Sequence, residues 1–122
     1  MRFIIGADDF GFSDHTVDRT IACFEAGALT GASIMARMPA TERAASWARA
    51  HPEFSYGVHL CFSTDEVERP VLPAEDIPSL VDGEGRFLDS NTMRWRGLLG
   101  RLPAMEIARE AAAQIARVRD LG

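Results

Sequence analysis

Three residues of this chain have the types and the spacing to bind a metal ion and activate water. Asp8 and Asp9 stand side by side in Ala7-Asp8-Asp9-Phe10-Gly11, and His59 follows fifty positions after Asp9 in Gly57-Val58-His59-Leu60. Carboxylate oxygens and an imidazole nitrogen form a sensible donor set for a divalent ion. Parallel β/α folds carry their chemistry at the carboxyl ends of strands. The sequence therefore predicts most of a metal site.

The acidic pair follows a short apolar run. Residues 2–7 are typical of a strand buried on both faces of a parallel sheet, which places Asp8 and Asp9 at its carboxyl end. Two adjacent carboxylates repel each other there, so a cation or a group of donors has to offset the repulsion. A structural role is also open, because an aspartate accepts backbone N–H bonds well and can cap the turn into the next helix.

His59 lies on a predicted strand from Phe54 to Phe62. By alternation it shares a face with Cys61 and points away from the more apolar face. A strand histidine is commonly a hydrogen-bonded structural residue, and Cys61 is either a soft ligand or a small packed residue. The metal interpretation requires that the first and third strands bring His59 close to Asp9.

Strands and helices alternate along the first half of the chain. Ser13 is the predicted N-cap of a helix from Asp14 to Ala26, and Gly27 is placed to end it. A second strand, Leu29 to Ala36, and a second helix, Thr41 to Ala50, follow. Repeating strand–helix units favour an α/β fold with a parallel sheet.

The second half is less regular. Residues 64–89 form a long connection that contains a predicted hairpin around Asp82-Gly83-Glu84-Gly85. A short helix, Asn91 to Leu99, carries Trp95, which is either a sugar-stacking platform or a core residue. A long helix from Pro103 to Leu121 ends the chain.

The long helix is amphipathic. Its apolar face holds Ile107, Ala111, Ile115 and Val118, and its charged residues, Glu110 among them, lie largely elsewhere. Three strands leave a sheet with open edges. We therefore expect the chain to form a homo-oligomer or to bind a companion chain that completes the sheet.

Four segments, in order along nearly the whole chain, resemble the YdjC-like carbohydrate deacetylases. That family includes diacetylchitooligosaccharide deacetylases and deacetylases associated with hopanoid biosynthesis. The segments are Ala7 to Ser13, Leu29 to Met35, Gly57 to Leu60 and Ile77 to Leu88. The resemblance implies that residues 1–122 are a single domain, the N-terminal part of a distorted β/α (TIM-like) barrel.

The resemblance also implies a reaction. It is removal of the N-acetyl group, a linear amide, from an acetylated amino sugar or oligosaccharide with the help of a divalent ion, Mg²⁺ or Zn²⁺. By that likeness Asp9 and His59 bind the ion, and Asp8 takes a proton from the attacking water. The chemistry is sound independently, because a divalent ion polarises a carbonyl and acidifies water, and a neighbouring carboxylate can act as the base.

The chain departs from the family pattern after its last helix. Family members continue into a histidine-rich stretch that supplies a further metal ligand and the general acid, whereas this chain ends at Gly122. A complete barrel of this kind needs roughly 250 residues, so we expect about half of one, and activity of the isolated chain is left open. Neither His15, on the first helix, nor His51, before Pro52, is expected to replace the further histidine.

Two other functions account for parts of the sequence. A non-catalytic sugar-binding or metal-binding fragment that needs a partner chain would keep the acidic pair and His59 without a general acid. A phosphoacceptor receiver domain would need a third aspartate at the end of the third strand and a later lysine. Here that strand carries His59, and the sequence has no lysine.

The composition argues against one class of binding partner. The net charge is −5 and the thirteen basic residues, all arginine, are scattered, which argues against nucleic acid. Cys23 and Cys61 do not form a disulfide framework. No run of residues resembles a signal peptide or a membrane span, so a cytoplasmic location is the simplest interpretation.

Overall fold

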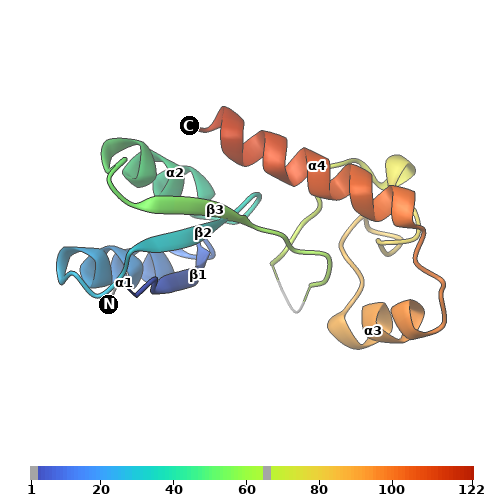
Figure 1. Cartoon of the computed structure of the whole chain (residues 1–122). Helices are drawn as coiled ribbons and strands as arrows, with labels where there is room; N and C mark the ends of the chain where they lie inside the picture. Colours follow the sequence, from blue (N-terminus) through green and yellow to red (C-terminus); the bar gives the residue numbers. More distant parts are fainter. Residues whose placement is uncertain (1–2, 65–66) are drawn as a thin grey trace.

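The computed structural model describes residues 3–64 and 67–122. In these residues three parallel strands alternate with two helices, and a short 3₁₀ helix and two further α-helices follow (Figure 1). The elements are β1 (Gly6–Phe10), α1 (Asp14–Glu25), β2 (Gly31–Met35), α2 (Thr41–Ala50), β3 (Ser55–His59), the 3₁₀ helix η1 (Ala74–Asp76), α3 (Ser90–Leu98) and α4 (Ala104–Asp120). The predicted α/β fold with a parallel sheet is confirmed, and closure into a barrel stays a prediction.

The sheet has the strand order β1-β2-β3, so β2 is central. Ala32 of β2 pairs with Ala7 of β1, and Met35 pairs with His59 of β3. The carboxyl ends of the three parallel strands therefore lie at one edge of the sheet. Close pairing at the other end depends on Gly31, because a Cβ there would lie 2.6 Å from the carbonyl oxygen of Ser55.

Helices α1 and α2 pack on one face of the sheet. Ser13 caps α1 as predicted, since its Oγ accepts the backbone N–H of Thr16 at 3.2 Å. The apolar residues of the sheet and of these helices form one core, called here the β/α cluster. Its buried members are Phe10, Val17, Phe24, Ala32, Ile34, Ala40, Ala44 and Ala48.

The first strand lies later in the chain than the sequence predicts. The prediction is residues 2–7, of which residue 2 is outside the described residues; the observed strand is Gly6–Phe10, so Asp8 and Asp9 lie inside it. The prediction of burial on both faces is also wrong, because the apolar residues before β1 are exposed, Ile4 by 94%. The reason is that β1 is an edge strand and its apolar start has no neighbour to cover it.

The other two strands are shorter than predicted. The predicted residues 29–36 contract to 31–35, and the predicted residues 54–62 contract to 55–59. His59 is therefore the last residue of β3 rather than a residue in its middle. Its side chain lies where the sheet ends and the long connection begins.

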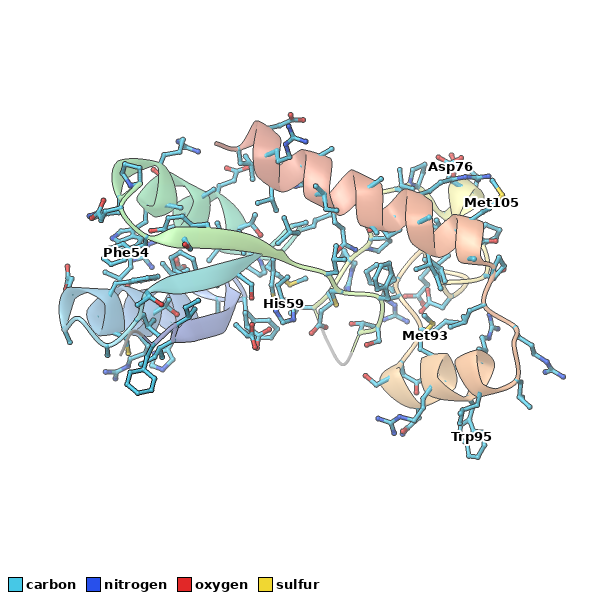
Figure 2. The ribbon with its side chains drawn as sticks, in the orientation of Figure 1. Phe54, His59, Asp76, Met93, Trp95 and Met105 are labelled. Carbon is cyan, nitrogen blue, oxygen red and sulfur yellow. The ribbon has the colours of Figure 1, made fainter. Side chains whose placement is uncertain are left out.

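The second half packs around apolar residues of its own, called here the loop cluster. Its buried members are Ile77, Leu80, Val81, Phe87 and Met93. The predicted hairpin is present, since Val81 and Phe87 form an antiparallel bridge. Helix α3 then carries Trp95, which projects into solvent with 64% of its surface exposed (Figure 2). The interpretation of Trp95 as a core residue is therefore wrong.

Helix α4 crosses from one cluster to the other (Figure 1). Ile107 packs against the loop cluster and Val118 against the β/α cluster. The predicted apolar face is only partly right, because Ile115 is 40% exposed whereas Glu110 and Gln114 are buried. The prediction that Glu110 lies away from the packing face is wrong, because its carboxylate accepts backbone N–H groups of the long connection.

Backbone groups of the long connection need hydrogen-bond partners, and α4 supplies them. The Glu110 carboxylate accepts the N–H groups of Val71 and Leu72 at 2.8 and 2.9 Å, and the amide of Gln114 at 2.9 Å. Gln114 in turn accepts the N–H of Cys61 at 3.0 Å and donates to its carbonyl oxygen at 2.7 Å. Just past the end of β3, the Gln114 side chain thus makes the backbone hydrogen bonds to Cys61 that a neighbouring strand would otherwise make.

The helices and the thiols add two observations. Within residues 3–64 and 67–122, no helix has the length and apolar character needed to cross a bilayer. Cys23 is exposed and Cys61 is half-buried, and neither is in a disulfide. The Cys61 thiol donates to the carbonyl oxygen of Ser63 at 3.0 Å.

Candidate active site

A β-bulge sets the positions of the two aspartates. The pairing of β1 with β2 is regular up to Ala7 and shifts before Phe10. Asp9, inside the bulge, has a φ of 59°, a left-handed conformation that aspartate adopts more readily than most residues. In a regular strand, consecutive side chains point to opposite faces. The bulge instead lets Asp8 and Asp9 both reach His59.

His59 lies at the same edge of the sheet, at the end of β3 (Figure 2). Its Nε2 is 3.4 Å from Asp9 Oδ1, and its Nδ1 is 3.7 Å from Asp8 Oδ1. Strands β1 and β3 are not neighbours, because β2 lies between them. The three residues therefore meet across the end of the central strand. The structure brings together all three residues singled out in the sequence, and their catalytic and metal-binding roles stay predictions.

Ser33 of β2 occupies the space between them. Its hydroxyl donates to Asp8 Oδ1 at 2.8 Å and lies 3.1 Å from His59 Nδ1. Sequence reasoning missed Ser33. The available signal was a polar residue in an otherwise apolar strand, on the face opposite Ala32 and Ile34, which pack in the β/α cluster.

The site is open to solvent. The side chains of Asp8, Asp9 and His59 are 80%, 56% and 30% exposed, so water screens much of the repulsion between the two carboxylates. The helix-capping alternative is not what the structure shows, because the cap of α1 is Ser13. The hydrogen bond that Asp8 accepts comes instead from Ser33, on the neighbouring strand.

Asp9 and His59 fit a divalent ion as two of its ligands. Two ligand atoms about 2.1 Å from an ion, at a near-tetrahedral angle, are separated by about 3.4 Å. The distance between Asp9 Oδ1 and His59 Nε2 is 3.4 Å. Among the residues that the structure describes, no group of three or more His, Cys, Asp and Glu side chains is arranged to hold a metal ion. The arrangement therefore offers two donors to an ion, Asp9 and His59.

The other two histidines, His15 and His51, have different surroundings. His15 is exposed on α1. His51 stacks on Trp47 with ring centroids 4.0 Å apart, and its Nδ1 lies 2.9 Å from the Trp47 carbonyl oxygen. These contacts place His51 against the aromatic side of the β/α cluster rather than beside His59.

Comparison with known proteins decides the family. A sequence model of the family described as "YdjC-like protein" matches residues 2–122. The chain belongs to the YdjC-like family. This confirms the resemblance found in four separate segments of the sequence, and it excludes the receiver-domain alternative.

Curated relatives of this YdjC-like chain carry the name carbohydrate deacetylase. The protein from Geobacillus stearothermophilus is 36% identical over 119 residues, which are 98% of this chain and 44% of the relative. The human protein is 34% identical over 122 residues, which are 99% of this chain and 36% of the relative. The chain spans less than half the length of these relatives.

A solved structure shares the fold of the YdjC-like chain. It is the crystal structure of an Enterococcus faecalis V583 protein provisionally named a cellobiose-phosphate cleavage protein. The two structures match with a TM-score of 0.85 and 30% sequence identity, over 98% of this chain and 44% of that chain. The arrangement of strands and helices described above thus recurs within a longer protein.

Proposed function

We propose that this YdjC-like chain carries part of the active site of a metal-dependent hydrolase, one that removes the N-acetyl group from an acetylated amino sugar or oligosaccharide. The observation that carries the proposal is the 3.4 Å separation of Asp9 Oδ1 and His59 Nε2, with Asp8 beside them. The substrate class comes from the relatives, which are named carbohydrate deacetylases.

Each of the three residues has a distinct role in this proposal. Asp9 and His59 hold the divalent ion, Mg²⁺ or Zn²⁺. When bound, such an ion polarises an amide carbonyl and lowers the pKa of water. Asp8 takes the proton of the attacking water through Oδ2, because its Oδ1 already accepts the hydroxyl of Ser33.

The reaction needs one further group. In hydrolysis of the linear amide, the water oxygen bonds to the carbonyl carbon, the C–N bond breaks, and acetate and an amine are released. Asp8 receives the water proton, and the departing amine has to receive one. The relative from Geobacillus stearothermophilus is more than twice as long as this chain, since the match covers 44% of it. We place the general acid and a third metal ligand in that further length.

A closed barrel is also part of the proposal. Helices α1 and α2 cover one face of the sheet, and Ser33 lies on the other face beside the site. That arrangement is the one expected of a barrel with helices outside and chemistry at the ends of its strands. We propose that a second copy of this chain or a companion chain covers the open edges of the three-stranded sheet. A monodisperse monomer in light scattering would contradict that association.

Acetate release tests the proposed reaction. The chain alone is compared with the chain fused to the carboxyl-terminal remainder of the Geobacillus stearothermophilus relative, on a panel of N-acetylated sugars with Mg²⁺ or Zn²⁺. We expect release from the fusion, a loss of about 100-fold or more in Asp8→Asn, and little change in Thr30→Ala, a hydroxyl deletion away from the site. If the folded fusion releases no acetate with either ion while the intact relative does, the hydrolase proposal fails.

A non-catalytic binding fragment is the second candidate, and the two-donor arrangement favours it. A site with only Asp9 and His59 as ligands binds an ion weakly and lacks a general acid. This function predicts that the fusion binds Zn²⁺ or an acetylated sugar in calorimetry without releasing acetate.

A further inference from the structure

We propose that Ser33 is a positioning residue that fixes which ring nitrogen of His59 carries the proton. Its hydroxyl is 2.8 Å from Asp8 Oδ1 and 3.1 Å from His59 Nδ1. The inference rests on the proposed function in one respect, since it treats His59 Nε2 as the metal-binding nitrogen. The first part of the inference, the position of the ring proton of His59, concerns only hydrogen bonds within the chain. The second part, the effect on metal binding, also needs the proposed function.

Counting hydrogens decides the direction of the two contacts. A serine hydroxyl has one hydrogen, and an ionised carboxylate only accepts. The short contact with Asp8 therefore uses the single hydrogen of Ser33, and Ser33 Oγ can only accept from His59. In the neutral imidazole, Nδ1 of His59 must then carry the ring proton, and Nε2 keeps a free lone pair.

The opposite arrangement is worse on the Nδ1 side of the imidazole. With the proton on Nε2, Nδ1 would need the hydroxyl hydrogen of Ser33, and two oxygen lone pairs would face each other over the 2.8 Å between Ser33 and Asp8. The proton on Nε2 would point toward Asp9 Oδ1 at 3.4 Å, beyond the usual range of about 2.7–3.2 Å for a hydrogen bond of this type. The weak attraction gained there is smaller than the loss of the 2.8 Å hydrogen bond between Ser33 and Asp8. The structure thus favours one tautomer, the one whose lone pair faces Asp9.

The central strand is the place from which one residue can do this. Ser33 lies between Ala32 and Ile34, the partners of Ala7 and Phe10, so it faces the bulge that holds Asp8 and Asp9. On its other side Ser33 pairs with Gly57, two residues before His59 on β3. Ser33 therefore orients the proposed base and the proposed metal ligand together. It leaves Asp8 Oδ2 and His59 Nε2, the two atoms that the reaction needs, outside its hydrogen bonds.

Nitrogen NMR of the metal-free chain tests the first part. With ¹⁵N-labelled histidine at alkaline pH, long-range proton–nitrogen correlations show which nitrogen of each imidazole is protonated. The chain has three histidines, and His59→Gln identifies the signals of His59. We expect the Nδ1–H form in the parent chain, a shift toward the Nε2–H form in Ser33→Ala, and retention of Nδ1–H in Ser33→Thr, which keeps a hydroxyl.

Thr30→Ala is the matched control. Thr30 also lies beside β2, but its hydroxyl bonds to the backbone of Ile5 at the other end of the strand. We expect it to leave the His59 signals unchanged. Nε2–H as the main form of His59 in the folded parent chain would overturn the inference, and so would the same tautomer in folded Ser33→Ala.

Calorimetric titration with Zn²⁺ separates this inference from the proposed function. Loss of a group that orients a metal ligand typically weakens metal binding about 10–100-fold, and we expect that loss in Ser33→Ala with recovery in Ser33→Thr. A tautomer shift in a chain whose parent form does not bind Zn²⁺ supports the role of Ser33 and contradicts the metal site. Equal Zn²⁺ affinity with an unchanged tautomer overturns the role of Ser33 and leaves the metal site standing.

Discussion

Glu110 provides a direct test of how α4 holds the long connection. Its carboxylate is buried and accepts the N–H groups of Val71 and Leu72. Each hydrogen bond to a charged group contributes about 1.5–3 kcal/mol, so Glu110→Ala removes roughly 3–6 kcal/mol through these two bonds. Because residues 71 and 72 are only half-buried, water replaces part of the loss. We therefore expect about 3 kcal/mol, a large fraction of the roughly 5–15 kcal/mol that stabilises a typical domain.

Urea unfolding followed by circular dichroism measures this loss, and two variants control it. Glu106→Ala removes a less buried carboxylate one turn earlier in α4, which accepts the N–H and the hydroxyl of Ser79 at 2.8 and 3.1 Å; we expect about 1 kcal/mol. Glu110→Gln keeps the shape of the side chain but turns an NH₂ group toward one of the two backbone N–H groups. We expect its loss of unfolding free energy to lie between those of Glu106→Ala and Glu110→Ala. If Glu110→Ala destabilises the chain no more than Glu106→Ala does, the assignment of α4 as the support of this connection is refuted.

Three further predictions concern other parts of the chain. Burial raises the pKa of Tyr56 from 10.0 to about 12. The stability that the neutral Tyr56 side chain contributes is therefore complete below pH 10 and is lost as the pH rises toward 12. Absorbance titration of this single tyrosine should give a midpoint near 12 in the folded chain and near 10 in urea. The hydroxyl and N–H of Thr92 lower the pKa of Asp89. The cap therefore stabilises α3 fully above the pKa that Asp89 has in the unfolded chain, and this stabilisation is lost as the pH falls through the lower pKa of the folded chain. Amide exchange in α3 should quicken on acidification, and Asp89→Asn should remove that dependence. Gly31→Ala would place a Cβ 2.6 Å from a carbonyl oxygen of β3 and should cost about 1–3 kcal/mol in thermal unfolding, whereas Gly57→Ala, with nothing within 4 Å of its added Cβ, should cost far less.

The order of strands and helices was predictable because its signals are local. Ser13 accepts from the first turn of α1, and Gly27 adopts a φ of 69° just past its end, as the sequence predicts. The start of β1 was not predictable in this way. An apolar run predicts a strand, but whether it is covered depends on neighbours that its own residues do not specify.

The candidate site was predictable in its residue types and not in its geometry. Regular alternation would send Asp8 and Asp9 to opposite faces, and the bulge that brings them together depends on how β1 pairs with β2. Ser33 is a polar residue in an apolar strand, but the sequence does not show that Asp8 and His59 lie on either side of it. Glu110 was misplaced for a similar reason, since a charged helix residue is usually solvated, and only the facing backbone gives it a reason to be buried.

Helix α4 ties the stability of two apolar clusters to each other. It is one continuous element of 17 residues, anchored by Ile107 at one end and Val118 at the other. If either cluster unfolds, α4 loses its packing contacts there, and the other cluster loses the support of a fixed α4. Loss of order should therefore spread as a single cooperative event, and the slowest-exchanging amides of β3 should report damage done at the far side of the molecule.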